Sequence, residues 1–432
     1  MRFIKQTFLK FRDIYNAWPL TYFIAISLVV RFLFNFNIFS LPELALQSDS
    51  GGYLHLGKTL LSDFAFPSLL RTPGYPALIS LTWLVTFTHS MIAVVIAQMI
   101  MDSLVPVIIS KTNGFFQDTG KETKTGALLY ALNPLAIYYS GKIMSESLFV
   151  FFLALSLYLI KKTVIEKREG WKNLFLTVMI VSTTVLTRPV GLGFYIILFV
   201  LFLWIFPKQK KITLQVAAGV AIILVAWMGK NYRTHDQFII STAGNYNLYI
   251  FGQNSYAGAH GISYAEAEEK FKPGLVKYAD ERIAWRDTKE AKNLGVKLIF
   301  ENKAGFLESS FIGALKTALQ PAWGVQQINL MLYKGKYEIQ EGSDLTNIGW
   351  SSILKFPYFE RLFSLTLSAI LLWSYGMAYL FIVIIFFVFK LKYLNNIKIK
   401  SLLILAILFF ILIAGPLGFS RFRYPAEMLI LI

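Results

Sequence analysis

Apolar runs of about the length that crosses a bilayer are the sequence feature that most constrains this chain. A helix needs about 20 apolar residues to cross the ~30 Å hydrocarbon layer. Candidate runs lie at 17–39, 91–110, 126–140, 143–160, 173–187, 190–206, 212–229, 362–389 and 401–417. Of the 432 residues, 56% are hydrophobic and 16% are charged, whereas soluble domains average roughly 45–50% and roughly 25%. We therefore predict an all-α polytopic membrane protein.

Charge and cysteine content narrow the function classes. The net charge of +17 suits nucleic acid or an anionic membrane surface, and the hydrophobicity selects the membrane and argues against nucleic acid. The sequence has no cysteine, which excludes disulfides, thiolate metal sites, iron-sulfur clusters and cysteine nucleophiles. Its four histidines show no HExxH-like spacing, which argues against a conventional zinc hydrolase.

The distribution of Lys and Arg predicts a cytoplasmic N-terminus. Two apolar runs, 73–88 and 305–323, are short or contain charges, and we expect both to lie on the outer membrane interface. The cytoplasmic loops are then 1–16, 111–125, 161–172, 207–211 and 390–400. Together they carry 19 Lys or Arg, against six in the short outer loops. If either run crossed the membrane, the later loops would change sides and violate the positive-inside rule.

Three regions follow from this topology. Residues 1–229 form an N-terminal transmembrane region that includes a first outer loop at 40–90, which we expect to be catalytic. Residues 230–361 form an extracytoplasmic segment, and residues 362–432 form a C-terminal transmembrane region. Only nine residues follow Arg423, and a helix of that length covers about 13 Å. We therefore expect either that the last segment dips into the membrane without crossing it or that the last helix is incomplete.

Arginines at the outer ends of predicted spans carry the strongest functional signal. They come from three distant parts of the sequence, at Arg71, Arg188, Arg421 and Arg423. Each lies shortly before a proline, where a helix must start or stop, so each can point into a shared cleft. Outer arginines violate the usual charge bias and indicate an anionic partner, and guanidinium matches phosphate oxygens bidentately. The alternative is that they reach individually to lipid headgroups.

Asp49 is the candidate proton acceptor among the outer acids. It lies in the stretch SDSGGYLHLGKTL, four residues before Tyr53, where a helix is expected to begin. One interpretation makes Asp49 a general base at the membrane surface beside the cations. The alternative is that Asp49, together with Ser48 and Ser50, only caps the helix.

The extracytoplasmic segment begins with amides and tyrosines and continues with helical patterns. Asn245, Asn247 and Asn254 lie among tyrosines between 242 and 256, which suits sugar hydroxyls and ring faces or, alternatively, an ordinary turn region. Ser263 to Glu266 forms a capping-box pattern that predicts a helix start, and we expect Pro273-Gly274 to interrupt that helix.

Taken in order, several stretches resemble one family of membrane enzymes. They are SDSGGYL, RTPGYPALISL, NPLAIYYSGKIMSESLFVFFLAL, TRPVGL, ISTAGNYNLYIFGQNSYAG and SRFRYPAEMLI. This set is similar to the multi-pass GT-C glycosyltransferases, and within them to the branch of bacterial aminoarabinose transferases and protein O-mannosyltransferases. The similarity runs in patches over nearly the whole chain.

The resemblance implies a fold and a reaction. The fold would be a GT-C-like helical bundle with interfacial helices in the first outer loop and a mixed extracytoplasmic segment. The reaction would be inverting transfer of a sugar from a polyprenyl-phosphate donor to a lipid, glycan or protein acceptor, on the outer face of the bacterial inner membrane. The acid of the family falls on Asp49, its cation on Arg71, and its late Arg-x-Arg on Arg421 and Arg423, while Glu146 lies at the outer end of its helix.

The predicted site thus has one catalytic residue, Asp49. The donor phosphate would be bound by Arg71, Arg188, Arg421, Arg423 and Lys142. The sugar or acceptor would be bound by Tyr53, Tyr75, Glu146, Asn245, Asn247 and Asn254. No cofactor follows from the residues. A divalent metal stays open, but Ser50 stands where many relatives have a second acid and Leu70 where some have Glu, so the resemblance does not carry a metal site over to this chain.

Elementary chemistry agrees with a single carboxylate. A phosphate monoester, with a second pKa near ~6, departs without a proton, so an acid and base pair is unnecessary. Arginines would stabilise the charge on the departing phosphate by about 3 kcal/mol for each well-placed donor. The competing functions are a transporter or flippase of lipid-linked sugars, for which the sequence shows no repeated halves, and a glycan polymerase or ligase with a diphosphate-linked donor.

Overall fold

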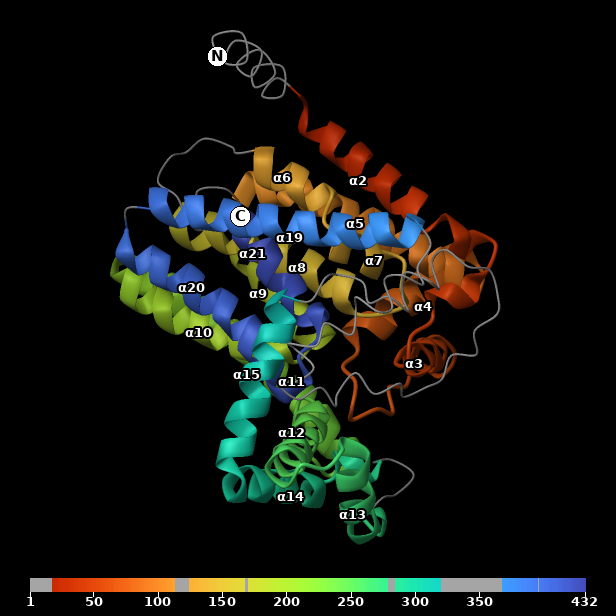
Figure 1. The fold of residues 1–432 in the computed structure, drawn as a ribbon. Coiled ribbons are helices and arrows are strands. Elements are labelled where there is room, and N and C mark those ends of the chain that lie inside the picture. The colour runs from red at the N-terminus through yellow and green to blue at the C-terminus, as the bar shows by residue number, and fades with distance from the viewer. Residues whose placement is uncertain (1–17, 113–123, 168–169, 279–283, 320–366, 395) are drawn as a thin grey trace.

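The computed structural model describes the chain in six stretches and shows two helical parts. The described residues are 18–112, 124–167, 170–278, 284–319, 367–394 and 396–432. All regular elements within these stretches are helices. Most of them form a bundle, and a smaller unit made of α12 to α15 projects from one end of it (Figure 1).

Four of the described helices are long and apolar enough to cross a membrane. They are α5 (Met91–Thr112), α8 (Glu146–Ile160) with its continuation to Ile165, α11 (Lys210–His235) and α19 (Leu367–Tyr393). Shorter apolar helices are α2 (Leu20–Phe34), α9 (Trp171–Thr187), α10 (Val190–Ile205) and α20 (Ile397–Leu412). The bundle is therefore compatible with a multi-pass membrane protein, while its orientation stays a prediction.

The predicted span at 126–140 is not one continuous helix, because two short helices occupy that stretch. They are α6 (Lys124–Ala131) and α7 (Pro134–Ser140). Asn133 separates them: its side-chain oxygen accepts hydrogen bonds from the backbone N–H groups of Leu135 and Ala136, and Pro134 occupies the first position of α7. An asparagine cap followed by proline starts a new helix and does not continue the old one.

The run at 73–88 forms a short helix that pairs with its neighbour in the 40–90 loop. α4 (Gly74–Thr86) packs against α3 (Ser50–Asp63), where a Cβ on Gly57 would lie 2.6 Å from the Ile79 side chain. This close approach needs a glycine. The opposite face of α4 leaves Leu84 and Val85 exposed, as a helix at a membrane interface would.

The α12–α15 unit is built from α12 (Ala243–His260), α13 (Tyr264–Val276), the short helix η5 (Trp285–Asp287), α14 (Lys289–Glu301) and α15 (Lys303–Leu319). The capping box at Ser263 and Glu266 is confirmed. The expected interruption at Pro273 is wrong, because α13 continues to Val276. Proline here removes only one hydrogen bond in the last turn. In the extracytoplasmic segment, which was expected to be mixed, the regular elements of the described residues are all helices, and 279–283 and 320–361 lie outside the described residues.

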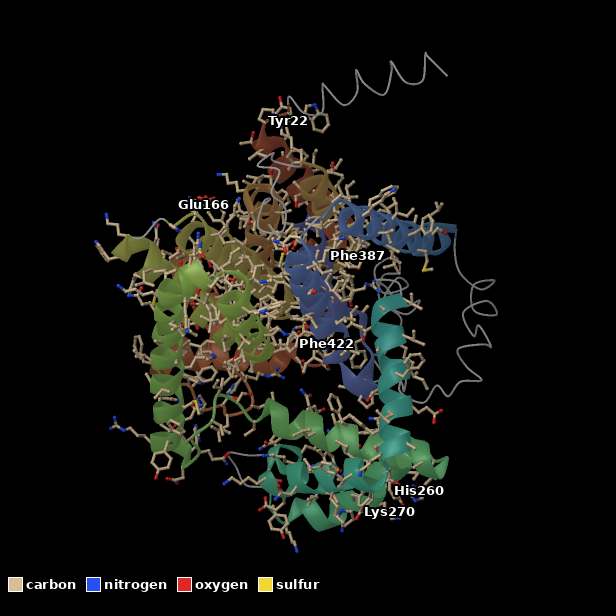
Figure 2. All side chains as sticks on the ribbon, turned by 90° about the vertical axis from the view of Figure 1, so that its left-hand side faces the viewer. Tyr22, Glu166, His260, Lys270, Phe387 and Phe422 are labelled. Carbon is tan, nitrogen blue, oxygen red and sulfur yellow. The ribbon has the colours of Figure 1, made fainter. Side chains whose placement is uncertain are left out.

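Glycine contacts hold this unit together and attach it to the bundle. A Cβ on Gly252 would lie 2.4 Å from the carbonyl oxygen of Gly295, so α12 and α14 touch backbone to backbone. A Cβ on Gly313 of α15 would lie 1.9 Å from the carbonyl oxygen of Gly415, which precedes the last helix. In Figure 2, Phe422 lies on the side of the bundle that faces the unit, and His260 and Lys270 mark the far end of the unit.

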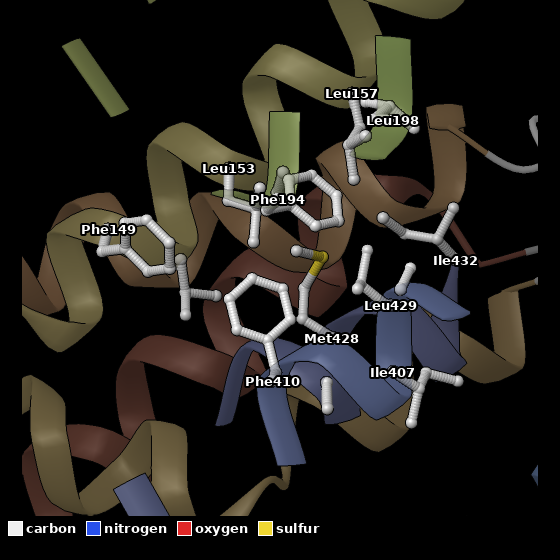
Figure 3. Packing of buried hydrophobic residues seen from close by; sticks show 14 of the residues in the cluster. Phe149, Leu153, Leu157, Phe194, Leu198, Ile407, Phe410, Met428, Leu429 and Ile432 are labelled. Carbon is white, nitrogen blue, oxygen red and sulfur yellow. The ribbon is translucent and has the colours of Figure 1, made fainter. Parts of the chain in front are cut away.

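The bundle interior combines apolar packing with a fully buried ion pair. Side chains such as Phe149, Phe194 and Phe410 pack against the last helix, α21 (Arg423–Leu431) (Figure 3). Arg31 and Asp102 pair at 2.6 Å, both fully buried. The carboxylate of Asp102 also accepts hydrogen bonds from the hydroxyls of Tyr130 and Tyr424. This network fixes the start of α21 and hence the residues just before it, including Arg421.

Candidate active site

One carboxylate and two guanidinium groups from three parts of the chain meet at the start of α3. Arg71 donates a hydrogen bond of 3.0 Å from Nη2 to Oδ1 of Asp49. Arg421 lies with its Nη1 3.9 Å from Oδ2 of the same carboxylate. Asp49 thus uses one oxygen for each arginine. The sequence predicted that these three residues belong to one site, and the structure brings them together.

Asp49 is held in place by its neighbour Ser50. The hydroxyl of Ser50 donates to the carbonyl of Ile143 at 2.8 Å and accepts from the N–H of Gln47 at 2.8 Å. Asp49 occupies the N-cap position of α3, but its side chain makes no capping hydrogen bond. The capping interpretation therefore does not explain this carboxylate, which is turned toward the arginines.

The guanidinium of Arg71 lies flat against the first turns of α3. Its central carbon is 4.3 Å from the centre of the Tyr53 ring, and the Tyr53 hydroxyl is 3.2 Å from the hydroxyl of Ser145. A Cβ on Gly52 would lie 3.1 Å from Nε of Arg71, whereas a Cβ on Gly51 would meet nothing within 4 Å. Gly52 therefore leaves the space in which Arg71 lies.

Arg188 joins the same region from the end of α9. It forms an ion pair with Glu146 at 2.5 Å and acts electrostatically on Asp49. The end of α9 and the start of α4 touch: Thr72 donates to the carbonyl of Thr187 at 3.3 Å. Arg71 and Arg188 are consequently neighbours although more than a hundred residues separate them in the sequence.

A crevice with one polar end opens beside Arg421. Its polar lining includes Arg188, Arg421 and Glu146, and its apolar walls include Phe149 and Phe410. The space in it that a water-sized sphere can reach is about 10 Å³, which is roughly the room for one water molecule. The Nε atom of Arg421 is buried and has no hydrogen-bond partner among the described residues. A buried donor of this kind needs an acceptor that the described chain does not provide.

Electrostatics keep Asp49 ionised. Burial acts to raise the pKa of Asp49, but attraction by Arg71 and Arg421 outweighs it, so the pKa lies below its usual value. The carboxylate is therefore charged at neutral pH and acts as a fixed counter-ion for the two arginines.

Two of the predicted cations have partners elsewhere. Arg423 is buried, bonds to Glu427 at 2.6 Å and donates to the carbonyls of Thr317 and Ala318, which joins α21 to α15. Lys142 donates to the carbonyl of Leu44. Burial lowers the pKa of Lys142 to about 8. Neither contact includes Asp49.

The predicted sugar or acceptor residues are spread more widely. Tyr53 contacts Arg71, and Glu146 contacts Arg188, whereas the hydroxyl of Tyr75 donates to Gln98 at 2.8 Å inside the bundle. Asn245 donates to the carbonyl of Asp287 at 3.1 Å, Asn254 donates to the carbonyl of Ile250 in its own helix at 2.9 Å, and Asn247 is exposed. All three asparagines lie on α12, so the alternative of a turn region is wrong.

The sequence analysis missed two features of the region. Gly52 has no side chain that would suggest a functional role. Two adjacent glycines inside a helix lower the stability of the helix, however, and this pattern could have drawn attention to the position. Asp287 lies in a charged stretch that is far from Asp49 in the sequence, and nothing there distinguishes it from the other charged residues. Within the described stretches, no group of three or more His, Asp or Glu side chains is placed to hold a metal ion.

Comparison with known proteins does not assign the chain to a family. No protein-family model matches the chain, and no curated protein matches it.

Proposed function

We propose that this protein is a membrane glycosyltransferase that moves a sugar from a polyprenyl-phosphate donor to an acceptor hydroxyl. The observation that carries the proposal is the meeting of Asp49 with Arg71 and Arg421 beside the apolar crevice. The resemblance of the sequence to GT-C glycosyltransferases points in the same direction. The proposal places the reaction on the extracytoplasmic face of a bacterial inner membrane.

The donor phosphate would take over part of the ion pairing that Asp49 provides to the arginines. Arg71, Arg421 and Arg188 come from three parts of the chain and all act on Asp49, and the N–H at Nε of Arg421 has no hydrogen-bond partner among the described residues. Guanidinium groups bind phosphate oxygens through paired hydrogen bonds. Asp49 carries a single negative charge. The three cations together exceed what that charge needs, and they better match the larger charge of a departing phosphate.

The apolar residues of the crevice would contact the first part of the lipid once the crevice widens to admit it. Phe149, Val150 and Phe410 suit an isoprenoid chain, and Arg188 and Arg421, which line the same crevice, would meet the phosphate. Binding sites for amphipathic ligands combine apolar walls with a few fixed polar groups in this way. A free sugar phosphate would use the arginines without the apolar walls.

The chemistry needs one proton acceptor and a stabilised leaving group. The acceptor oxygen attacks the anomeric carbon, the bond from that carbon to the phosphate oxygen breaks, and the electron pair leaves with the phosphate. The acceptor proton passes to a carboxylate. Since the attack and the departure occur on opposite faces, the configuration inverts.

The test uses purified full-length protein in liposomes. We expect it to release polyprenyl phosphate from a polyprenyl-phosphate sugar when envelope lipids and glycans are added as acceptors, with the sugar recovered on an acceptor. A transporter or flippase would move the donor between leaflets without breaking it. A polymerase or ligase would require a diphosphate-linked donor. If the monophosphate donor is not cleaved, then movement of the intact donor between leaflets, or activity only with a diphosphate-linked donor, contradicts the proposal.

The space left by Gly52 gives a sharp test of the placement of Arg71. In Gly52→Ala the new methyl group should push the guanidinium away from Asp49 and lower transfer roughly 10-fold, since small misplacements are costly in catalysis. The helix itself should not suffer, because alanine favours a helix by about 1 kcal/mol over glycine. The measurement is the transfer rate together with the melting temperature in detergent.

Gly51→Ala is the matched control for this substitution. It makes the same chemical change one residue earlier, where a Cβ meets nothing within 4 Å. Its transfer rate should stay within about twofold of the wild type, in keeping with an exposed surface position. Equal rates in the two variants would contradict the placement of Arg71.

A further inference from the structure

Asp287 is a buried carboxylate that the proposed mechanism has not used. It ends the short helix η5, between α13 and α14, and only 5% of its surface is exposed. Its Oδ1 atom is buried and has no hydrogen-bond partner among the described residues. Leaving a buried polar atom unpaired destabilises a protein, and more so when the group is charged. Such an atom in a native structure calls for an explanation, and a catalytic or ligand role is one.

Backbone and side-chain hydrogen bonds place Asp287 close to Arg71. Ser241 and Thr242, just before α12, donate to the carbonyls of Leu70 and Leu69, the latter at 2.9 Å. Asn245, in the first turn of α12, donates to the carbonyl of Asp287 at 3.1 Å. The first turn of α12 therefore connects the residue before Arg71 to Asp287 itself.

Electrostatic interactions extend this connection to the active site. Arg71 acts on the carboxyl of Asp287, and Tyr246 of α12 interacts with both Asp49 and Asp287. Asp287 thus faces the same region as Asp49, but from the α12–α15 unit. The two carboxylates approach the arginines from different parts of the protein.

The two carboxylates differ in how free they are to accept a proton. Asp49 gives one oxygen to Arg71 and the other to Arg421, and this pairing holds its pKa low. A carboxylate stabilised in this way is a weak base. Burial, by contrast, raises the pKa of Asp287 to about 6, against the opposing effect of Arg286 and Arg71. A base works best with a pKa near the working pH.

We propose that Asp287 contacts the acceptor hydroxyl and takes its proton, while Asp49 holds Arg71 and Arg421 in place for the donor phosphate. This inference rests on the proposed function and replaces Asp49 as the base within it. The O–H bond of the acceptor breaks and its proton moves to the free oxygen of Asp287. The electron pair stays on the acceptor oxygen and forms the bond to the anomeric carbon. The phosphate leaves with the electron pair of the old bond, so no other reactant is needed.

The groups around Asp287 define the expected pH dependence. Arg286 lies on the same short helix and is held by Glu268 of α13, with 2.8 Å between its Nε and the carboxylate. Arg71 approaches from the 40–90 loop and Tyr246 from α12. The charged residues that open α14, Lys289 and Glu290, are exposed. Asp287 must be ionised to accept a proton, so transfer should fall as the pH drops through about 6.

The experiment compares Asp287→Asn with the wild type in the liposome transfer assay. We expect the variant to lose at least about 100-fold in transfer, the usual effect of removing a general base, and the residual rate to show no decline near pH 6. Its binding of polyprenyl monophosphate should stay within about twofold of the wild type, because the donor arginines are untouched. Asp236→Asn, the same change at an exposed residue after α11, is the control and should transfer normally.

Three outcomes overturn the inference. An Asp287→Asn variant that transfers at nearly the wild-type rate removes Asp287 from the reaction while leaving the proposed function intact. A variant that loses donor binding together with transfer shows a structural role. If the variant does not fold, the wild-type protein alone decides, because a rate that is constant from about two pH units below to about two above that pKa excludes this base. Failure of the wild type to transfer overturns the proposed function itself.

Discussion

Asp49→Asn should lower the rate of sugar transfer at least about 100-fold, because it releases two guanidinium groups that each act on the leaving phosphate. Asparagine has the size of aspartate but no charge and only one acceptor oxygen, so it cannot hold both Arg71, at 3.0 Å from Asp49, and Arg421, at 3.9 Å. The loss should fall on kcat. The donor should bind as well as before or more tightly, since a neutral amide no longer competes with phosphate for the arginines.

The measurement is the split between kcat and KM for the polyprenyl-phosphate donor. Asp63→Asn is the matched control, because it makes the same change at the exposed end of the same helix. The control should transfer at the wild-type rate, and both variants should insert and melt like the wild type. If Asp49→Asn transfers normally, or loses only donor affinity, Asp49 does not organise the site.

Arg71→Ala should reduce transfer roughly 100- to 1000-fold, the effect of deleting one preorganised donor to a developing charge. Arg71 is the best placed of the three arginines, since it bonds to Asp49, stacks on Tyr53 at 4.3 Å and is attached through its loop to α12. Both donor affinity and kcat should fall, because the phosphate is charged before and after the reaction.

Two further variants separate geometry from charge. Arg71→Lys keeps the charge but loses the planar fork and the ring contact, so it should recover only a small part of the rate. Lys58→Ala removes an exposed cation from α3 of the same loop and should leave transfer unchanged. If Lys58→Ala and Arg71→Ala behave alike, the loop supplies only diffuse positive charge and no phosphate site.

Local sequence signals predicted the helices and part of the site. Apolar runs found the long helices, and the capping box at Ser263 found the start of α13. Prolines after Arg71 and Arg188 marked helix ends, which is why these arginines could be expected to face one cleft. These signals depend only on short stretches of sequence, and the helices and helix ends named here are present in the structure.

Features that depend on distant partners could not be predicted from the sequence. Arg423 has the same local signature as Arg421, yet it turns to Glu427 and the end of α15, because α15 packs against the turn before α21. Asp287 lies near Arg71 only because Ser241 and Thr242 attach α12 to the 40–90 loop. Such contacts become visible only when the chain is folded.

Local rules also failed where two signals compete. The stretch 126–140 is apolar enough for a span, but Asn133 and Pro134 divide it. Pro273 is a strong helix breaker in isolation, but it lies in the last turn of α13, where few hydrogen bonds remain to be lost.

The most direct measurement is a cryo-electron microscopy structure of the full-length protein in nanodiscs with polyprenyl monophosphate. We expect density for the phosphate within hydrogen-bond distance of Arg71 and Arg421, near Asp49, with the isoprenoid chain against Phe410 in a widened crevice. Phosphate density at another place in the protein, with these arginines still paired to Asp49 alone, would contradict it.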